Sequence, residues 1–133
     1  MESKGEILIR KILQKEGYFF KQEYSFPQLK SYKGAPLRFD FAVFNGSKLA
    51  ALIEWQGEQH YHYVEHFTKN KMNWKYARER DLQKARFALL NGIPLYCIPY
   101  SDYDKIHTSK DIFSDMYLIK NKWDIYKEHQ AKT

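Results

Sequence analysis

One apolar stretch, residues 37–61 (LRFDFAVFNGSKLAALIEWQGEQHY), carries two acidic residues where a solvated surface charge is not expected. Apolar side chains recur along both halves, and NGSK lies between them, which is typical of a β-hairpin. Asp40 falls on the first strand and Glu54 on the second. If the loop covers 46–48, Asp40 faces Glu54 across the ladder, with Cβ atoms about 5 Å apart.

The alternation also assigns each hairpin side chain to a face of the sheet. In the first strand, one face carries Leu37, Phe39, Phe41 and Val43, and the other carries Arg38, Asp40 and Ala42. In the second strand, Ala50, Leu52, Glu54 and Gln56 share a face.

Two carboxylates this close on an apolar sheet repel each other. Protonation of one acid, a salt bridge to a cation such as Arg38, or a bound metal ion would relieve the repulsion. Oxygen ligands at this spacing suit Mg²⁺, with Mn²⁺ as the alternative. We therefore hypothesise a metal site held by Asp40 and Glu54.

A helix is predicted before the hairpin. Ser3 and Glu6 have the spacing of a capping box, and the helix should run to about Glu16 and stop at Gly17. On a helical wheel Glu6 lies about 20° from Leu13, at the edge of the apolar face. Two interpretations stay open: Glu6 only caps the helix, or it also points into a site.

A second helix is predicted over 71–91, ended by Gly92. Its inward stripe is Trp74, Ala77, Asp81, Ala85 and Ala88. A buried Asp81 needs a partner. A structural bond to His60 or an arginine and a catalytic role are both consistent with this position.

The remaining elements are a strand over 18–24, an apolar strand over 93–100 and a final amphipathic helix over 111–128. The expected fold is α/β: an αβββαβ core with a central mixed four-stranded sheet flanked by helices, plus the C-terminal helix. We expect one domain over 1–133, with its core at about 3–100 and a helical extension at 110–129.

The net charge of +6 and the pI of about 9.3 suit a polyanionic partner such as DNA. Cys97, the sole cysteine, falls in an apolar strand and is expected in the core. The histidine-rich stretch 58–67 fits no closed zinc motif, which favours one functional histidine, His60. No apolar run has membrane-spanning length, so we expect an intracellular, cytoplasmic protein without a membrane partner.

The motifs SKGE, RFDF, IEWQGEQHY, RDLQK and GIPLYCIPY follow one another in this order from Ser3 to Tyr100. Together with the order of elements, the pattern resembles the PD-(D/E)XK nuclease superfamily. More narrowly, it is similar to phage and intron-associated (homing) endonucleases of the EDxHD type, which are related to the very-short-patch repair endonucleases. Residues after Tyr100 lie outside the resemblance.

The resemblance implies a Mg²⁺-dependent endonuclease that hydrolyses phosphodiester bonds in DNA. Asp40 and Glu54 would match the metal-binding acids, and Gln56 takes the place usually held by lysine. His60 would accept a proton from water or stabilise the oxyanion, and Asp81 would orient His60. Gln56 would contact the phosphate or the water.

Glu6 would complete this site, either through a water or by binding the metal. The expected phosphate contacts are Lys33, Arg38, Arg78 and Lys84. Because the chain is small, reading a long recognition site would be difficult unless it forms a homodimer. The alternative is a non-catalytic nucleic-acid-binding domain on a decayed nuclease scaffold, for which the Gln56 substitution is the main support.

Overall fold

The structure, a computed structural model, describes residues 2–58 and 71–126. Its elements follow the expected order αβββαβ, and the α/β fold class is confirmed. In chain order they are α1 (Lys4–Lys15), β1 (Phe19–Lys30), β2 (Pro36–Asn45), β3 (Lys48–Gln56), α2 (Lys71–Leu90), β4 (Leu95–Pro99), the 3₁₀ helix η2 (Tyr100–Lys105), α3 (Ser109–Ile112) and the 3₁₀ helix η3 (Lys122–Tyr126).

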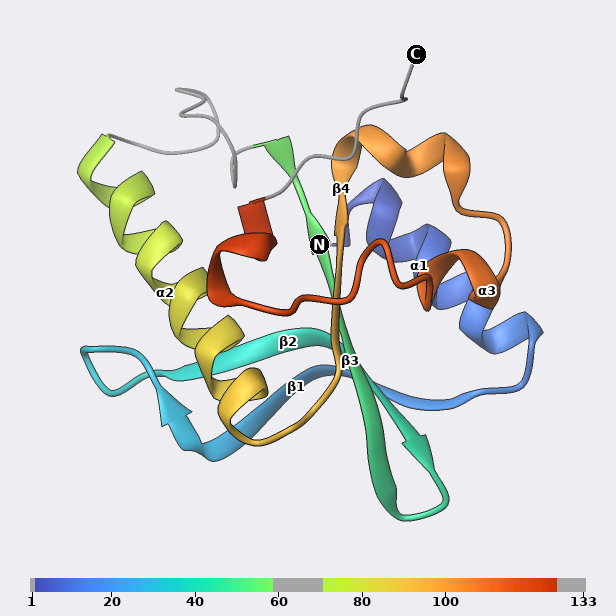
Figure 1. The fold of residues 1–133 in the computed structure, drawn as a ribbon, viewed down its shortest axis with the longest axis horizontal. Coiled ribbons are helices and arrows are strands. Elements are labelled where there is room, and N and C mark those ends of the chain that lie inside the picture. The colour runs from blue at the N-terminus through green and yellow to red at the C-terminus, as the bar shows by residue number, and fades with distance from the viewer. Residues whose placement is uncertain (1, 59–70, 127–133) are drawn as a thin grey trace.

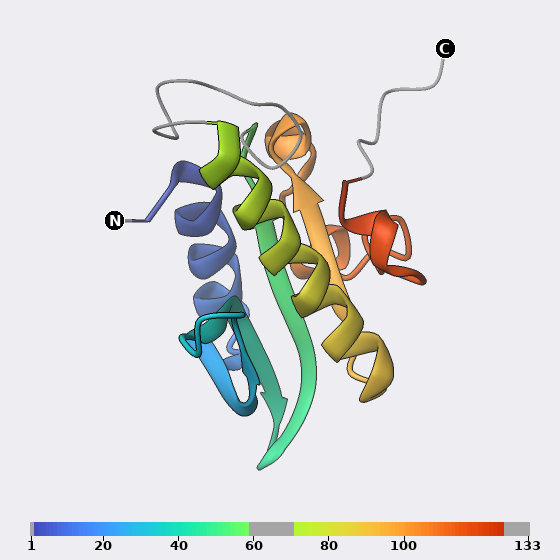
Figure 2. The same cartoon turned by 90° about the vertical axis from the view of Figure 1, so that its left-hand side faces the viewer.

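The four strands form one mixed sheet in the order β1-β2-β3-β4. The first three strands are antiparallel neighbours, whereas β3 and β4 run parallel and are joined through α2. Helices α1 and α2 lie on opposite sides of this sheet (Figure 1), and in the turned view they flank the long β3 strand (Figure 2). The result is a layered α/β/α arrangement.

Each face of the sheet has its own apolar core. On the α1 side, Ile9, Ile12 and Leu13 pack against a cluster that includes Phe41 and Ile53. The α2 side contains Leu29, Leu37, Phe39, Ala42, Leu52, Ala85, Ala88, Leu95, Cys97, Ile119 and Ile125. Cys97 is buried there, as expected. Because both faces are covered, β3 is buried along most of its length.

Helix α1 begins and ends as predicted. Ser3 is its N-cap, and a capping box joins Ser3 to Glu6. Gly17, just past its end, has a φ of 78°, which a residue without a Cβ adopts readily. Gly5 is buried against the Trp55 indole, and a Cβ built on it would lie 2.0 Å from Trp55 Cε2. The glycine thus lets α1 approach β3 closely.

The hairpin reaches the expected pairing by a different route. Asn45 pairs with Lys48, so the turn is the two residues Gly46 and Ser47 rather than a loop over 46–48. A register shift then follows, because Phe44 pairs with Leu49 but Val43 pairs with Ala51. The shift restores the register expected for the three-residue loop, and it brings Asp40 beside Glu54.

The predicted faces of β2 are wrong over half of the strand. Leu37 and Phe39 lie in the core on the α2 side, whereas Phe41 lies on the α1 side. The change falls at Asp40, and opposite Asp40 in β1 lies Glu23, a non-glycine residue with a φ of 52°. This backbone irregularity interrupts the alternation that a regular pleat would impose.

Strand β1 is longer than the predicted 18–24. It continues to Lys30, past Phe26 and Pro27, with a register shift between Ser25 and Lys30. An edge strand tolerates proline because one side of its backbone lacks a partner strand.

The C-terminal helix is present but short. Instead of a helix over 111–128, α3 covers four residues, and residues 117–119 run extended along β4. The Cys97 N–H donates to the Tyr117 carbonyl at 2.9 Å, and the Ile119 N–H donates to the Leu95 carbonyl at 3.0 Å. The unpaired backbone groups of β4 therefore override the helical pattern.

None of the helices in the described part of the chain has the length and apolar character that a membrane span requires.

Substituting Gly5 by Ala should destabilise the fold by about 1–3 kcal/mol, because the added methyl group collides with the Trp55 ring and displaces α1. Urea denaturation measures this change. The matched control is Gln14→Ala on the exposed face of the same helix, which should change stability by no more than about 0.5 kcal/mol. Equal stability of the two variants would contradict the close approach of α1 to β3.

Candidate metal centre

Three acidic side chains from three different elements converge at one end of α1. Glu6 comes from α1, Glu23 from β1 and Asp40 from β2, and one carboxylate oxygen of each lies within 4.8 Å of the others. Glu6 and Asp40 are half-buried, whereas Glu23 is exposed. Carboxylate oxygens are the donors that Mg²⁺ and Mn²⁺ prefer. The donor set therefore fits a hard divalent cation.

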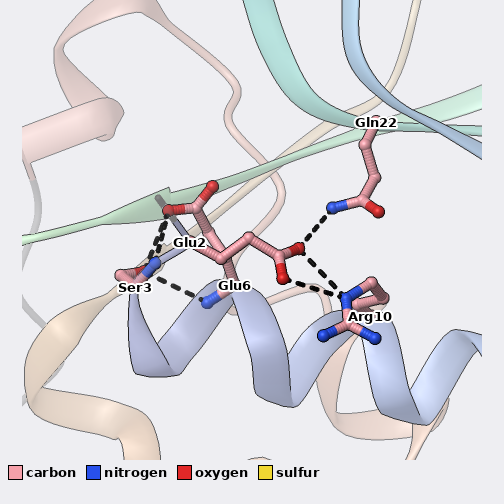
Figure 3. A network of polar contacts seen from close by, with 5 residues as sticks. All are labelled: Glu2, Ser3, Glu6, Arg10 and Gln22. Carbon is pink, nitrogen blue, oxygen red and sulfur yellow. Dashed lines mark hydrogen bonds and ion pairs between the residues drawn. The ribbon is translucent and has the colours of Figure 1, made fainter.

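Glu6 caps α1, and its carboxyl group also lies in the acidic cluster. Its Oε1 accepts hydrogen bonds from the Ser3 backbone N–H at 3.2 Å and from Ser3 Oγ at 3.0 Å (Figure 3). The same carboxyl group belongs to the acidic cluster. Ser3 Oγ in turn accepts from the Glu6 N–H at 3.2 Å. The helix cap thus fixes where this carboxylate lies.

A polar contact beside the cluster connects α1 to β1. The Arg10 guanidinium donates to both oxygens of Glu2, at 3.1 and 3.0 Å, and Gln22 donates to Glu2 at 2.6 Å (Figure 3). The hydrogen bond from Arg10 is the main reason that the pKa of Glu2 is lowered. The strand residue Gln22, next to Glu23, is thus linked through Glu2 to Arg10 of α1.

Asp40 and Glu54 contact each other through the backbone, as the hairpin pairing requires. The Asp40 N–H donates to Glu54 Oε2 at 2.6 Å, and the Trp55 N–H donates to Asp40 Oδ2 at 2.7 Å. Each carboxylate thus replaces a ladder hydrogen bond where β2 is irregular. Glu54 does not belong to the cluster of Glu6, Glu23 and Asp40.

Lys84 supplies the cation of the predicted salt-bridge alternative, in place of Arg38. Its ammonium lies on the inward side of α2, is buried, and pairs with Glu54 Oε1. Burial lowers the pKa of Lys84, but Glu54 and then Asp40 more than offset this, and the net pKa is raised. Lys84 therefore stays protonated at neutral pH. The expected contact of Lys84 with a phosphate does not fit this position, because other side chains cover the ammonium.

Asp40 is an acid that needs a neutralising partner. Desolvation, followed by the nearby Glu54 carboxylate, raises the pKa of Asp40 well above its usual range, while Lys84 opposes the rise. Burial also raises the pKa of Glu54, again opposed by Lys84. The single ammonium of Lys84 does not balance the carboxyl groups of both Asp40 and Glu54. A proton or a cation on Asp40 relieves the excess negative charge.

Asp81 is buried on the inward face of α2, as predicted. Its charge acts on both members of the ion pair: it favours the protonated forms of Glu54 and Lys84. His60, its expected partner, lies outside the described residues. The role of Asp81 in orienting His60 therefore stays a prediction.

Gln56 lies deeper than its expected role requires. It is completely buried, and neither amide atom has a hydrogen-bond partner among the described residues. The amide lies beside the Cys97 thiol, a weak partner, whose own pKa is raised well above its usual range by burial. Complete burial does not fit the predicted contact of Gln56 with a phosphate.

The other residues expected to contact phosphates lie at the surface. Lys33 and Arg38 are exposed. Arg78 is half-buried, and its guanidinium lies over the rings of Trp74, at 4.9 Å, and Tyr126, at 4.0 Å. That Lys33, Arg38 and Arg78 contact DNA stays a prediction.

Sequence reasoning missed Glu23 at this site and misplaced Lys84. No recognisable motif in the sequence marks Glu23. Its position in the cluster depends on the strand register and on a positive φ. For Lys84 a signal existed, since it lies three residues after Asp81, where helical periodicity places side chains on the same face.

Comparison with known proteins adds one viral relative. The chain is 28% identical, over 130 residues, to "Uncharacterized protein 307L" of Invertebrate iridescent virus 6. The match covers 87% of this chain and 62% of the relative, so the chain spans less than two thirds of that protein. No family model and no solved structure matches the chain. The relative's name gives no activity, so function must be argued from the site.

Removing Lys84 alone should cost more stability than removing the whole ion pair. In Lys84→Met the Glu54 carboxylate loses its buried partner, which should destabilise the fold by about 3–5 kcal/mol at pH 8. The double variant Glu54→Gln with Lys84→Met carries no buried charge at these positions and should recover much of the loss. Urea denaturation of the two single variants and the double variant gives the coupling energy. Additive effects would argue against a direct ion pair.

Asp40→Asn should stabilise the metal-free protein at neutral and higher pH. A raised pKa means that the folded state binds the Asp40 proton more tightly than the unfolded chain, so folding stability falls as pH rises above about 4. Asparagine cannot ionise, and its side-chain oxygen can still accept from the Trp55 N–H. We expect a gain of about 1 kcal/mol or more at pH 8 in EDTA that shrinks toward pH 4.

Asp104→Asn, at an exposed position of η2, is the matched control and should leave the pH dependence unchanged. Thermal denaturation at several pH values measures both variants. Lower stability of Asp40→Asn at pH 8 would show that the ionised carboxylate is already compensated without a cation.

Proposed function

We propose that the protein is a divalent-metal-dependent DNA endonuclease of the PD-(D/E)XK type, with Mg²⁺ or Mn²⁺ as its cofactor. The observation that carries this proposal is the convergence of Glu6, Glu23 and Asp40 from three elements beside the buried pair of Glu54 and Lys84. The element order and the motifs RFDF and IEWQ support the same class. The basic composition suits a polyanionic substrate.

In this proposal the metal ligands are Glu6, Glu23 and Asp40. Both oxygens of Glu54 already accept hydrogen bonds, from Asp40 and Lys84, so Glu54 serves mainly to hold those two groups in place. This differs from the predicted ligand pair of Asp40 and Glu54. A bound divalent cation would polarise a phosphate and lower the pKa of a water.

Lys84 takes over the positive charge that Gln56 cannot supply. The resemblance places a lysine at the position of Gln56, two residues after Glu54 on β3. Here the ammonium reaches Glu54 from α2 instead. It stays protonated, so it acts by stabilising negative charge and does not accept a proton. This placement weakens the main support for a decayed, non-catalytic scaffold.

The proton acceptor in the proposal is His60, whose ordinary pKa near 6.5 allows it to accept a proton at neutral pH. Asp81 lies on α2 one turn before Lys84 and faces inward. A carboxylate in that position can orient a histidine as well as adjust the charge near Glu54.

The test is cleavage of supercoiled plasmid with Mg²⁺, with products separated as nicked and linear forms. Asp40→Asn and Glu23→Gln should each lower the rate by about 100-fold or more, and EDTA should stop the reaction. Asp104→Asn, at an exposed acid that does not belong to the cluster, should cut as the wild type does. Isothermal calorimetry with Mg²⁺ alone separates loss of the metal from loss of chemistry.

Undiminished cutting by Asp40→Asn would rule out this site. Normal cutting by Glu23→Gln would remove Glu23 from the ligand set and leave the rest intact. If the wild type cuts no form of DNA and binds no divalent metal, the protein is a non-catalytic binding domain instead.

A further inference from the structure

A shallow groove of about 480 Å³ lies between the first half of α2 and η3, on a face of α2 next to the one that carries Asp81 and Lys84. Among the side chains that line it are Trp74, Lys75, Tyr76, Arg78, Trp123 and Tyr126, and we call it the α2–η3 groove. In Figure 1, η3 lies against the middle of α2, and these two elements are in contact. The volume falls within the range of small-ligand sites.

Large aromatic rings are left open to solvent at this groove. Tyr76 is 54% exposed and Trp123 is 59% exposed. By contrast, the inner wall is held in place: the Tyr126 hydroxyl donates to the Arg78 carbonyl at 2.6 Å, and the Arg78 guanidinium lies between the Trp74 and Tyr126 rings. Burial, followed by Asp81, raises the pKa of Tyr126 to about 12, so its hydroxyl remains a donor. The groove thus has a fixed wall and two accessible rings.

The charge at the groove favours an anionic occupant. Lys75 and Arg78 line it, and the Lys122 ammonium lies 5.0 Å from the Trp123 ring centroid. Glu79 is the acidic residue among those that line it. Exposed rings alternating with cations are the composition with which proteins bind single strands, because bases stack on the rings and phosphates lie near the cations. A duplex offers fewer free base faces for such stacking.

We propose that the α2–η3 groove binds a single strand of nucleic acid, with unpaired bases stacked on Tyr76 and Trp123 and phosphates beside Lys75 and Arg78. The choice of nucleic acid as the ligand rests in part on the proposed function. If the protein cuts DNA as proposed, its preferred substrate would then contain single-stranded or locally opened DNA.

The experiment measures binding of a fluorescein-labelled 12-nucleotide oligo(dT) by anisotropy, with the full chain in EDTA so that no cleavage occurs. Trp123→Ala and Tyr76→Ala should each weaken binding by about 5- to 150-fold, as expected for the loss of one stacked base. Trp123→Phe should retain most of the affinity. Tyr32→Ala, at a tyrosine that is 97% exposed outside the groove, is the matched control and should bind as the wild type does.

Lys75→Gln should reduce the salt dependence of binding, whereas Lys11→Gln on the exposed face of α1 should not. Oligo(rU) and a blunt duplex of equal length serve as competitors. Competition by oligo(rU) as strong as that by oligo(dT) assigns the groove to single strands of either sugar, and stronger competition by the duplex overturns the proposal. Wild-type affinity in both Trp123→Ala and Tyr76→Ala also overturns the proposal. So does a concentration-dependent self-association of the chain, if Trp123→Ala abolishes the self-association but leaves oligo(dT) binding unchanged.

Failure here is distinguishable from failure of the proposed function. Groove-dependent binding in EDTA without any Mg²⁺-dependent cutting would uphold the groove and refute the nuclease. Plasmid cutting that depends on Asp40, with oligo binding that ignores Tyr76 and Trp123, would refute the groove alone.

Discussion

The reciprocal contact between Asp40 and Glu54 holds the centre of this structure together. Each carboxylate accepts a backbone N–H from the opposite strand, so the two strands stay joined where β2 changes faces. The arrangement puts two acids in a poorly solvated place, and Lys84 reaches Glu54 from α2 and offsets part of their charge. Helix α2, the hairpin and the acidic cluster are therefore electrostatically dependent on one another. Each of these charges shifts the pKa of its neighbours.

Hydrophobic periodicity and capping signals were enough to predict the order of elements. Helix α1 is capped by Ser3 and ends before Gly17, and α2 ends before Gly92, because these signals act over a few residues. The C-terminal segment carried a helical pattern as well. Its outcome was decided by the free edge of β4, a partner that lies twenty or more residues away along the chain and that no local signal reveals.

The site was predictable in part. Asp40, Glu54 and Asp81 were recognisable because an acid among apolar neighbours is costly and therefore informative. Glu23 was not, since its place in the cluster depends on a positive φ that breaks the alternation of β1. The same irregularity invalidated the assigned faces of β2. Lys84 was assigned to a phosphate contact because basic residues are common around α2, although its spacing from Asp81 indicated the inward face on which it is buried.

The extended segment along β4 also limits how two copies of this chain can associate. Sheets in two protomers often join edge to edge, and that route requires a strand with free backbone groups. Residues 117–119 already occupy those groups on β4. At the opposite edge, β1 is interrupted by the turn of its backbone at Glu23 and by Pro27. A symmetric pair would therefore have to form through helices or loops, which would leave each four-stranded sheet, and the acids on it, complete within a single chain.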